Sequence, residues 1–164
     1  MSTPAPAPYA IREAAGAADL EAARALFREY AQWLQVDLCF QGFDEELATL
    51  PGRYARPDGR LFLARRDGTP VGCAALRRFD ADAGEVKRLY VQPAHRGRGL
   101  ARALTAAVID AARTIGYRRL LLDTLDRMAE ARSLYVETGF REIPAYYANP
   151  LCGTVYMELE LRET

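Results

Sequence analysis

The sequence predicts a mixed α+β fold, in which helices cover both faces of a central, twisted and mostly antiparallel sheet of about six to seven strands. Three strand-like segments follow one another between residues 60 and 91, with short polar turns between them, as in antiparallel hairpins. Residues 100–115 then carry apolar side chains at spacings of three and four, which is typical of an amphipathic helix. The apolar run RRLLLDT at 118–124 is typical of a strand buried on both faces.

The first fifty residues add one strand and two helices to this plan. Residues 9–13 (YAIRE) predict a strand, and residues 43–50 (FDEELATL) predict a short helix. Between them, Asp19 is predicted to cap a longer helix. The apolar face of that helix is expected to comprise Leu20, Ala23, Phe27, Tyr30 and Leu34.

The middle of the chain predicts a parallel unit within the sheet. Strands are expected at 60–66, 71–79 and 85–91, joined by the turns DGTP and DADAG. The last of these precedes the helix of 100–115, which Gly116 is expected to end. Residues 85–124 therefore predict two parallel strands joined by a right-handed crossover helix.

The C-terminal part predicts one more helix and one more strand. Asp126 is expected to cap a helix that runs through Met128 and Tyr135 and ends at Gly139. Residues 153–161 (GTVYMELEL) alternate between apolar and polar side chains, which predicts a strand. One face of that strand is expected to carry Val155, Met157, Leu159 and Leu161.

Composition and charge exclude several classes of protein. The 164 residues hold 22 Lys plus Arg and 22 Asp plus Glu, so the net charge is zero and bulk binding of nucleic acid is not expected. No apolar run reaches the length of a membrane span, and we expect no membrane partner. Cys39, Cys73 and Cys152 lack metal-ligand spacing and suggest reduced thiols, hence a cytoplasmic protein with no metal. We expect a disordered Pro/Ala-rich tail over residues 1–8 and one domain over residues 9–164.

The segment RGRG at 96–99 lies where a strand ends and a helix begins. Gly97 and Gly99 let the backbone approach a ligand, and the unpaired N–H groups of a helix start favour an anion. Arg96 and Arg98 add donors suited to phosphate oxygens, so the segment predicts a pyrophosphate site. No Lys-Ser or Lys-Thr pair follows, which excludes a P-loop. A dinucleotide-binding fold, with Asp123 at the end of the next strand, and a plain helix start with solvated arginines stay open as alternatives.

The stretch VQPAHRGRGLARAL resembles the pyrophosphate-binding motif of the GNAT superfamily, the acyl-CoA-dependent N-acyltransferases. Arg96, Gly99 and Ala101 fill the pattern of that motif. EVKRLYV resembles the fourth strand of the family, and ARSLYVETGF resembles its last helix and the strand after it. The resemblance implies a GNAT-like fold and acetyl-CoA as co-substrate. The implied cofactor-binding residues are Leu89, Val91, Arg96, Gly97, Arg98, Gly99, Leu100 and Ala101. One departure from the family is Met128, where many members carry Asn.

The resemblance also implies a chemistry in which an amine attacks the thioester directly. Tyr135 resembles the general acid that protonates the leaving thiolate, and a core tyrosine is the alternative. Glu85 resembles a base that acts directly or through water, and a solvated glutamate at a strand end is the alternative. The backbone N–H near Val91 is expected to hold the thioester oxygen. His95, the only histidine, is expected to face solvent and to take no part in catalysis.

The acceptor site is predicted from the fourth strand and from the segment IPAYYANPL at 143–151. Strict alternation would place Glu85, Lys87, Leu89 and Val91 on one face of the strand, and Val86, Arg88 and Tyr90 on the other. Candidate substrate-binding residues are Lys87, Arg88, Tyr146, Tyr147 and Asn149. They would suit a small amine that also carries a carboxylate. In the alternative, Lys87 pairs with Glu85, while Tyr146 and Tyr147 only cover the core.

Two functions of different classes follow from these observations. The first is an N-acetyltransferase that moves the acetyl group of acetyl-CoA to a primary amine of a small molecule or peptide. The second is a non-catalytic CoA-binding or interaction module on the same fold. The pair Glu85 and Tyr135 favours the enzyme. A homodimer stays open as an oligomeric state.

Overall fold

The computed structural model describes residues 9–38 and 42–161. In chain order its elements are β1 (Tyr9–Glu13), α1 (Gly16–Leu34), α2 (Phe43–Thr49), η2 (Gly52–Tyr54), β2 (Arg60–Arg66), β3 (Thr69–Arg78), β4 (Ala83–Val91), η3 (Pro93–His95), α3 (Leu100–Ile115), β5 (Arg119–Leu125), α4 (Ala129–Thr138), β6 (Arg141–Ile143) and β7 (Thr154–Glu160). The tail expected at residues 1–8, like Cys39, lies outside the described residues.

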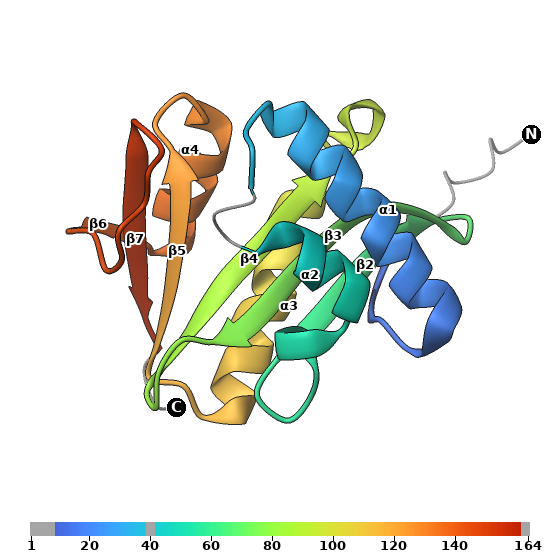
Figure 1. The fold of residues 1–164 in the computed structure, drawn as a ribbon, viewed down its shortest axis with the longest axis horizontal. Coiled ribbons are helices and arrows are strands. Elements are labelled where there is room, and N and C mark those ends of the chain that lie inside the picture. Colours follow the sequence, from blue (N-terminus) through green and yellow to red (C-terminus); the bar gives the residue numbers. More distant parts are fainter. Residues whose placement is uncertain (1–8, 39–41, 162–164) are drawn as a thin grey trace, which may run out of the picture.

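The strands form one seven-stranded sheet in the order β1-β2-β3-β4-β5-β7-β6 (Figure 1). Every neighbouring pair is antiparallel except β4 and β5, which are parallel and are joined through α3. This confirms the predicted mixed sheet with its parallel strand–helix–strand unit. The short edge strand β6 was not predicted from periodicity, because three residues are too few to show a pattern.

Helices cover both faces of the sheet, as predicted (Figure 1). On one face, α3 packs Leu104 and Val108 against the sheet, and the cluster extends to Tyr135 of α4. On the other face, α1 and α2 bury Phe27 and Leu47 against β2 and β3. The inward residues predicted for the last strand all belong to the α3 cluster: Val155, Met157, Leu159 and Leu161.

Strands β4 and β5 pair only at their start and then part. Their register runs from Ala83–Glu85 against Arg119–Leu121, and β5 bonds to β7 over its whole length. The remainder of β4, as far as Val91, pairs only with β3. The sheet therefore opens between β4 and β5, toward the upper end of the view in Figure 1.

A β-bulge at Arg88 breaks the alternation of β4. Arg88 has a φ of 59°, and the register with β3 shifts between Cys73 and Ala75. One residue of β3 thus faces two of β4, which reverses the alternation after Lys87. Leu89 and Val91 pack with Val86 in the α3 cluster, whereas Tyr90 packs under α1. The prediction that Leu89 and Val91 share a face with Glu85 and Lys87 is therefore wrong.

Two predicted helix caps are also wrong. Helix α1 begins at Gly16, so Asp19 lies in its first turn, where its carboxylate accepts a hydrogen bond of 2.7 Å from the N–H of Ala15. Helix α4 begins at Ala129, and its N-cap is Met128 rather than Asp126. Gly116 and Gly139 end α3 and α4 as predicted, with φ of 105° and 113°.

Two kinds of structural feature are absent from residues 9–38 and 42–161. No helix in that part of the chain is both long enough and apolar enough to span a membrane. The same residues bring together no cluster of His, Cys, Asp and Glu that would hold a metal ion. The thiol of Cys73 is buried and that of Cys152 is exposed.

Candidate functional site

A pocket lies where β4 and β5 part. Side chains of β4 and β5 form its floor, and α1, α4 and the segment 149–151 form its walls. Its polar lining includes Tyr30, Lys87, Arg88, Asp123, Tyr135 and Asn149. The opening of the sheet therefore creates a site that contains charged groups of both signs and two phenols.

The predicted glycine turn follows the end of β4 and leads into α3. Gly97 and Gly99 have φ of 77° and 79°, and Gly99 is the N-cap of α3 without a side-chain cap. The first turn of α3 carries no acidic residue, so the positive end of its dipole is not neutralised locally. A Cβ added to either glycine would meet no atom of the described residues within 4 Å. This turn has the open backbone that a pyrophosphate needs.

The arginines of the turn differ in their surroundings. Arg96 lies over the ring of Trp33 at 4.4 Å, and its Nε donates to the carbonyl of Val91 at 2.9 Å. Arg98 is exposed. In the same region Leu100 is buried in the core, and Ala101 packs against it, so these two residues offer a ligand only their backbone. The predicted role of all four in cofactor binding stays a prediction.

Tyr135 lies in the pocket, and 6% of its surface is exposed. Its ring contacts that of Phe140 edge-on, with 5.6 Å between the ring centres. Within residues 9–38 and 42–161, no group hydrogen-bonds to its hydroxyl. Burial raises the pKa of Tyr135 well above its ordinary value of 10.0, so the phenol keeps its proton at neutral pH.

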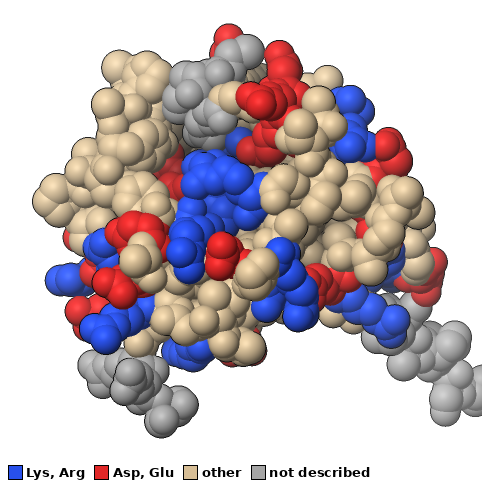
Figure 2. All heavy atoms as spheres, turned by 60° about the horizontal axis from the view of Figure 1, so that its bottom comes forward, with Lys and Arg blue, Asp and Glu red and all other residues tan. Residues whose placement is uncertain are grey.

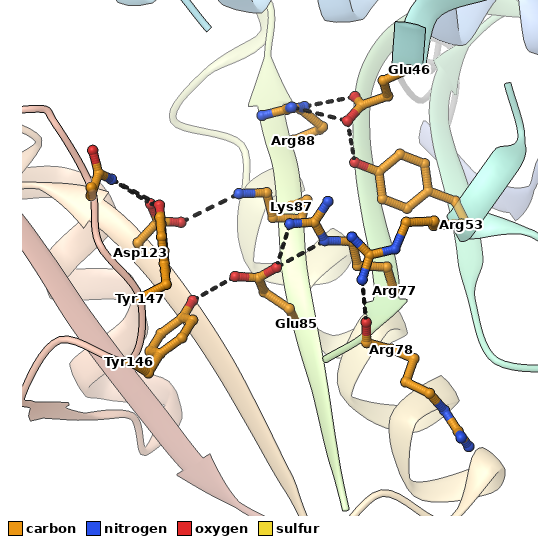
Figure 3. Close-up of polar contacts among 12 residues, drawn as sticks. Glu46, Arg53, Arg77, Arg78, Glu85, Lys87, Arg88, Asp123, Tyr146 and Tyr147 are labelled. Carbon is orange, nitrogen blue, oxygen red and sulfur yellow. Dashed lines mark hydrogen bonds and ion pairs between the residues drawn. The ribbon is translucent and has the colours of Figure 1, made fainter. Parts of the chain in front are cut away.

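Glu85 is buried, with only 2% of its surface exposed, so the alternative of a solvated strand-end glutamate is wrong. One carboxylate oxygen accepts hydrogen bonds from Arg77, at 2.8 Å from Nε and 2.8 Å from Nη2 (Figure 3). The other accepts a bond of 2.6 Å from the hydroxyl of Tyr146. Both oxygens are therefore held, and Glu85 does not contribute to the lining of the pocket.

Lys87 pairs with Asp123 of β5, with 3.5 Å between Nζ and Oδ1, so the alternative pairing of Lys87 with Glu85 is wrong. Burial lowers the pKa of Lys87, and the charges of Asp123 and Glu85 offset part of that effect. The second oxygen of Asp123 accepts hydrogen bonds from the hydroxyl of Tyr147 and, at 3.3 Å, from Nδ2 of Asn149 (Figure 3). The two predicted tyrosines thus do more than cover the core, since Tyr146 bonds to the buried Glu85 and Tyr147 to the largely buried Asp123.

Arg88 points toward α2 because of the bulge in β4. Its Nε and Nη2 donate to the two oxygens of Glu46 at 2.9 and 3.0 Å, and its guanidinium lies 5.2 Å from the ring centre of Phe43. The hydroxyl of Tyr54 donates to the same carboxylate at 2.9 Å. Lys87 and Arg88 therefore both line the pocket, although strict alternation would separate them.

Basic side chains gather around this network. Figure 3 shows the side chains of Arg53 and Arg77 near Lys87, whereas that of Arg78 points away from Lys87 and Arg88. Lys and Arg side chains also gather at the centre of the face shown in Figure 2, with acidic side chains at their margins. Such a surface favours the approach of an anionic molecule.

Some of these residues were not predicted from the sequence. Tyr30, Arg77 and Glu46 come from elements whose contacts depend on the tertiary fold. Asp123 gave a usable signal, because a carboxylate at the end of a buried apolar strand needs a partner. From the sequence alone, Asp123 is interpreted only as the acid of a dinucleotide-binding fold.

Comparison with known families decides what kind of protein this fold and pocket belong to. Residues 20–140 match the model of the acetyltransferase (GNAT) family. The chain belongs to this family. An uncharacterised N-acetyltransferase of Schizosaccharomyces pombe is 40% identical over 145 residues, which cover 87% of this chain and 89% of that protein.

Solved structures agree with the GNAT assignment. A Klebsiella pneumoniae protein assigned as an acyl-CoA N-acyltransferase is 28% identical, with a TM-score of 0.76 over 94% of this chain and 98% of that one. The N-acetylglutamate synthase of Neisseria gonorrhoeae, complexed with coenzyme A and N-acetyl-glutamate, is 24% identical. Its TM-score is 0.71 over 96% of this chain and 36% of that one, and at this identity the likeness concerns the fold alone. These findings disfavour the dinucleotide-binding alternative for this GNAT chain.

Proposed function

We propose that this GNAT protein is an acetyl-CoA-dependent N-acetyltransferase that acts on a primary amine by direct attack, with residues 9–164 as its one domain. The observation that carries the proposal is the pocket between β4 and β5, with the buried phenol of Tyr135 inside it. The uncapped start of α3 lies just beyond the end of β4. The start of α3 suits a pyrophosphate, and the pocket beside Tyr135 suits the transfer of the acyl group.

Cofactor binding is proposed at the glycine turn and along the free part of β4. The N–H groups at Gly97, Gly99 and Leu100 would hold the pyrophosphate, with Arg98 as an added cation. Leu89 and Val91 belong to the part of β4 that pairs with no described strand on its β5 side, so the backbone there, apart from the Val91 carbonyl held by Arg96, is open to an extended cofactor arm. Arg96 contributes in this proposal through its bond to Val91, by fixing the end of β4.

Tyr135 acts as the general acid in this proposal. The amine attacks the thioester carbon, the C–S bond breaks, and the leaving thiolate takes the proton of the Tyr135 hydroxyl. A phenol whose pKa is raised by burial holds that proton until the thiolate develops. Glu85 stays a predicted base, acting through its bond to Tyr146 or through water.

The acceptor is proposed to be a small amine that carries a carboxylate, such as an amino acid. The pocket offers Lys87 and Arg88 to a carboxylate and Asp123 to an ammonium group. Tyr146, Tyr147 and Asn149 fix this side of the site from the segment before β7. A polyamine would leave the buried cations facing further positive charge.

The proposal is tested by incubating the protein with acetyl-CoA and a panel of amines while thiol release is followed. The panel contrasts two amines that carry a carboxylate, glycine and L-glutamate, with two that do not, phenethylamine and putrescine. Amine-dependent thiol release, fastest with an amino acid, supports the enzyme and the acceptor class. If acetyl-CoA raises the melting temperature but no amine gives thiol release, the chain is a non-catalytic CoA-binding module.

A further inference from the structure

Asp123 is a largely buried carboxylate of the pocket that takes no proton in the proposed mechanism. Its side chain is 11% exposed and lines the same pocket as the phenol of Tyr135. We propose that Asp123 binds the ammonium group of the acceptor and takes its proton, which makes it a catalytic residue. This inference rests on the proposed N-acetyltransferase function.

The geometry favours Asp123 over Glu85 for direct proton transfer. Glu85 has both oxygens engaged by Arg77 and Tyr146, and it lies outside the pocket lining. Asp123 reaches into the pocket from β5, beyond the point where β4 and β5 stop pairing. A base has to come within hydrogen-bond reach of the proton it removes, and only Asp123 of these two carboxylates lines the space where an acceptor fits.

The ion pair with Lys87 does not close Asp123 to a substrate. The distance of 3.5 Å between Lys87 Nζ and Asp123 Oδ1 is longer than the roughly 2.7–2.9 Å of a charge-assisted hydrogen bond. The other oxygen accepts bonds from two neutral donors, Tyr147 and Asn149. Oδ1 therefore keeps room for a second donor, and a substrate ammonium supplies one.

Tyr147 and Asn149 are positioning residues in this proposal. The Oδ1 atom of Asn149 accepts the N–H of Leu151 at 2.8 Å, which directs its NH₂ group toward Asp123 and toward the hydroxyl of Tyr147 at 2.8 Å. The ring of Tyr147 is packed edge-on against Tyr156, with 5.5 Å between the ring centres. The carboxylate is thus held in one orientation by a segment that is itself anchored.

The proton transfer completes the reaction without any further reagent. The ammonium gives one proton to Asp123 and becomes an amine, whose lone pair forms the C–N bond to the thioester carbon. The C–S bond then breaks, and the thiolate takes the proton of Tyr135. The second proton of the nitrogen returns to the Tyr135 oxygen, and Asp123 releases its proton to solvent.

Several charged or titratable groups surround Asp123 and contribute to any pH dependence. They come from β4, α1, α4, β7 and the segment before β7. The groups are Glu85, Lys87, Arg88, Tyr30, Tyr135, Tyr156, Tyr146 and Tyr147. Burial raises the pKa of Tyr30 to about 12, so that phenol stays neutral through the range of the test.

The test compares Asp123→Asn with the parent, using whichever of glycine, L-glutamate, phenethylamine and putrescine gives the highest kcat/KM in the parent. We expect Asp123→Asn to lower kcat/KM at pH 7 by about 10²-fold or more, which is the usual loss of a general base. The loss shrinks as pH rises, because free amine then needs no base. Tyr147→Phe should show a smaller loss with the same dependence on pH, and it serves if Asp123→Asn does not fold.

One control variant and one binding measurement separate the outcomes. Asp110→Asn makes the same chemical change on the exposed face of α3 and should leave the pH profile unchanged. An unchanged stabilisation by acetyl-CoA shows that Asp123→Asn is folded. If the parent is active but the Asp123 and Tyr147 variants keep the parental profile, or if Glu85→Gln alone shows the pH-dependent loss, the role of Asp123 is overturned. A parent that gives no thiol release with any of the amines overturns the proposed function itself, and this inference with it.

Discussion

Tyr135 is the residue on which the proposed chemistry depends most. It is buried, it lines the pocket, and burial raises the pKa of its phenol. From the sequence alone, Tyr135 is either a general acid or a tyrosine packed in the core, because both kinds of tyrosine occur on the apolar face of a helix. Its place in the pocket, with a hydroxyl that bonds to no described residue, favours the acid.

Replacing Tyr135 by Phe should keep acetyl-CoA binding and lower kcat by about 10²–10⁴-fold, the usual contribution of a general acid. The measurement is steady-state thiol release, with binding followed by the shift in melting temperature. Tyr117→Phe is the matched control, because Tyr117 is equally buried but bonds to the carbonyl of Asp58, away from the pocket. Parental turnover by Tyr135→Phe would make Tyr135 a packing residue.

The raised pKa of Tyr135 also predicts a pH profile for kcat. A phenol acts as an acid only while protonated, and a raised pKa extends the protonated form to higher pH. We therefore expect kcat to stay level up to about pH 10, where an ordinary tyrosine is half ionised. A fall of kcat that begins near pH 8 would contradict this assignment of the acid.

At the scale of the elements, helix α3 carries the same backbone feature at both ends. Gly99 at its start and Gly116 at its end have φ of 79° and 105°, and a Cβ on either would meet no described atom within 4 Å. Alanine at either position is therefore strained by a comparable amount, about 1–2 kcal/mol. Only the start of the helix belongs to the proposed cofactor site.

We expect Gly99→Ala and Gly116→Ala to lower the free energy of unfolding by similar amounts, measured by chemical denaturation. Acetyl-CoA at about 100 times its Kd should then add about 2.7 kcal/mol to Gly116→Ala and much less to Gly99→Ala. The difference arises because a Cβ at residue 99 points into space that the pyrophosphate would occupy. Equal stabilisation of both variants by acetyl-CoA would remove the glycine turn from the binding site.

Strand β4 and helix α2 are tied by the ion pair of Arg88 and Glu46. Glu46→Ala removes two charge-assisted hydrogen bonds from the buried guanidinium of Arg88, and a hydrogen bond to a charged group is typically worth about 1.5–3 kcal/mol. Glu46→Ala also deprives the hydroxyl of Tyr54 of its acceptor. We expect this variant to lose about 3 kcal/mol in urea unfolding, while the exposed neighbour Glu45→Ala changes little. A loss below about 1 kcal/mol would show that the pair does not anchor α2.

At the scale of the whole molecule, the sequence predicted the layered fold well, because strand alternation and helix periodicity are local. The helix caps predicted at Asp19 and Asp126 are wrong, because both residues bond elsewhere. The carboxylate of Asp19 accepts a hydrogen bond from the N–H of Ala15, and the backbone N–H of Asp126 donates to a carbonyl outside α4. The bulge at Arg88 was not predictable, because it depends on pairing with β3. For the same reason, the sequence predicted Tyr135 and Glu85 as site residues but did not predict the hydrogen-bond partners of Glu85 or the position of Asp123 in the pocket.

The parting of β4 and β5 is the feature that turns this sheet into a candidate enzyme. It leaves the last part of β4 without a described strand on its β5 side and opens a pocket beside Tyr135, and the chain leads from β4 to the uncapped start of α3. Membership of the GNAT family agrees with that arrangement. The proposed transfer from acetyl-CoA to an amine needs all three features in one molecule.

Transfer of a labelled acetyl group tests this account most directly. The protein is incubated with acetyl-CoA labelled in its acetyl group and with glycine, L-glutamate, phenethylamine or putrescine, and the products are separated and identified by mass. The account predicts label on the nitrogen of an amine, at a rate that falls with Tyr135→Phe and not with Tyr117→Phe. Label that remains on CoA or appears only as acetate with every amine would contradict it.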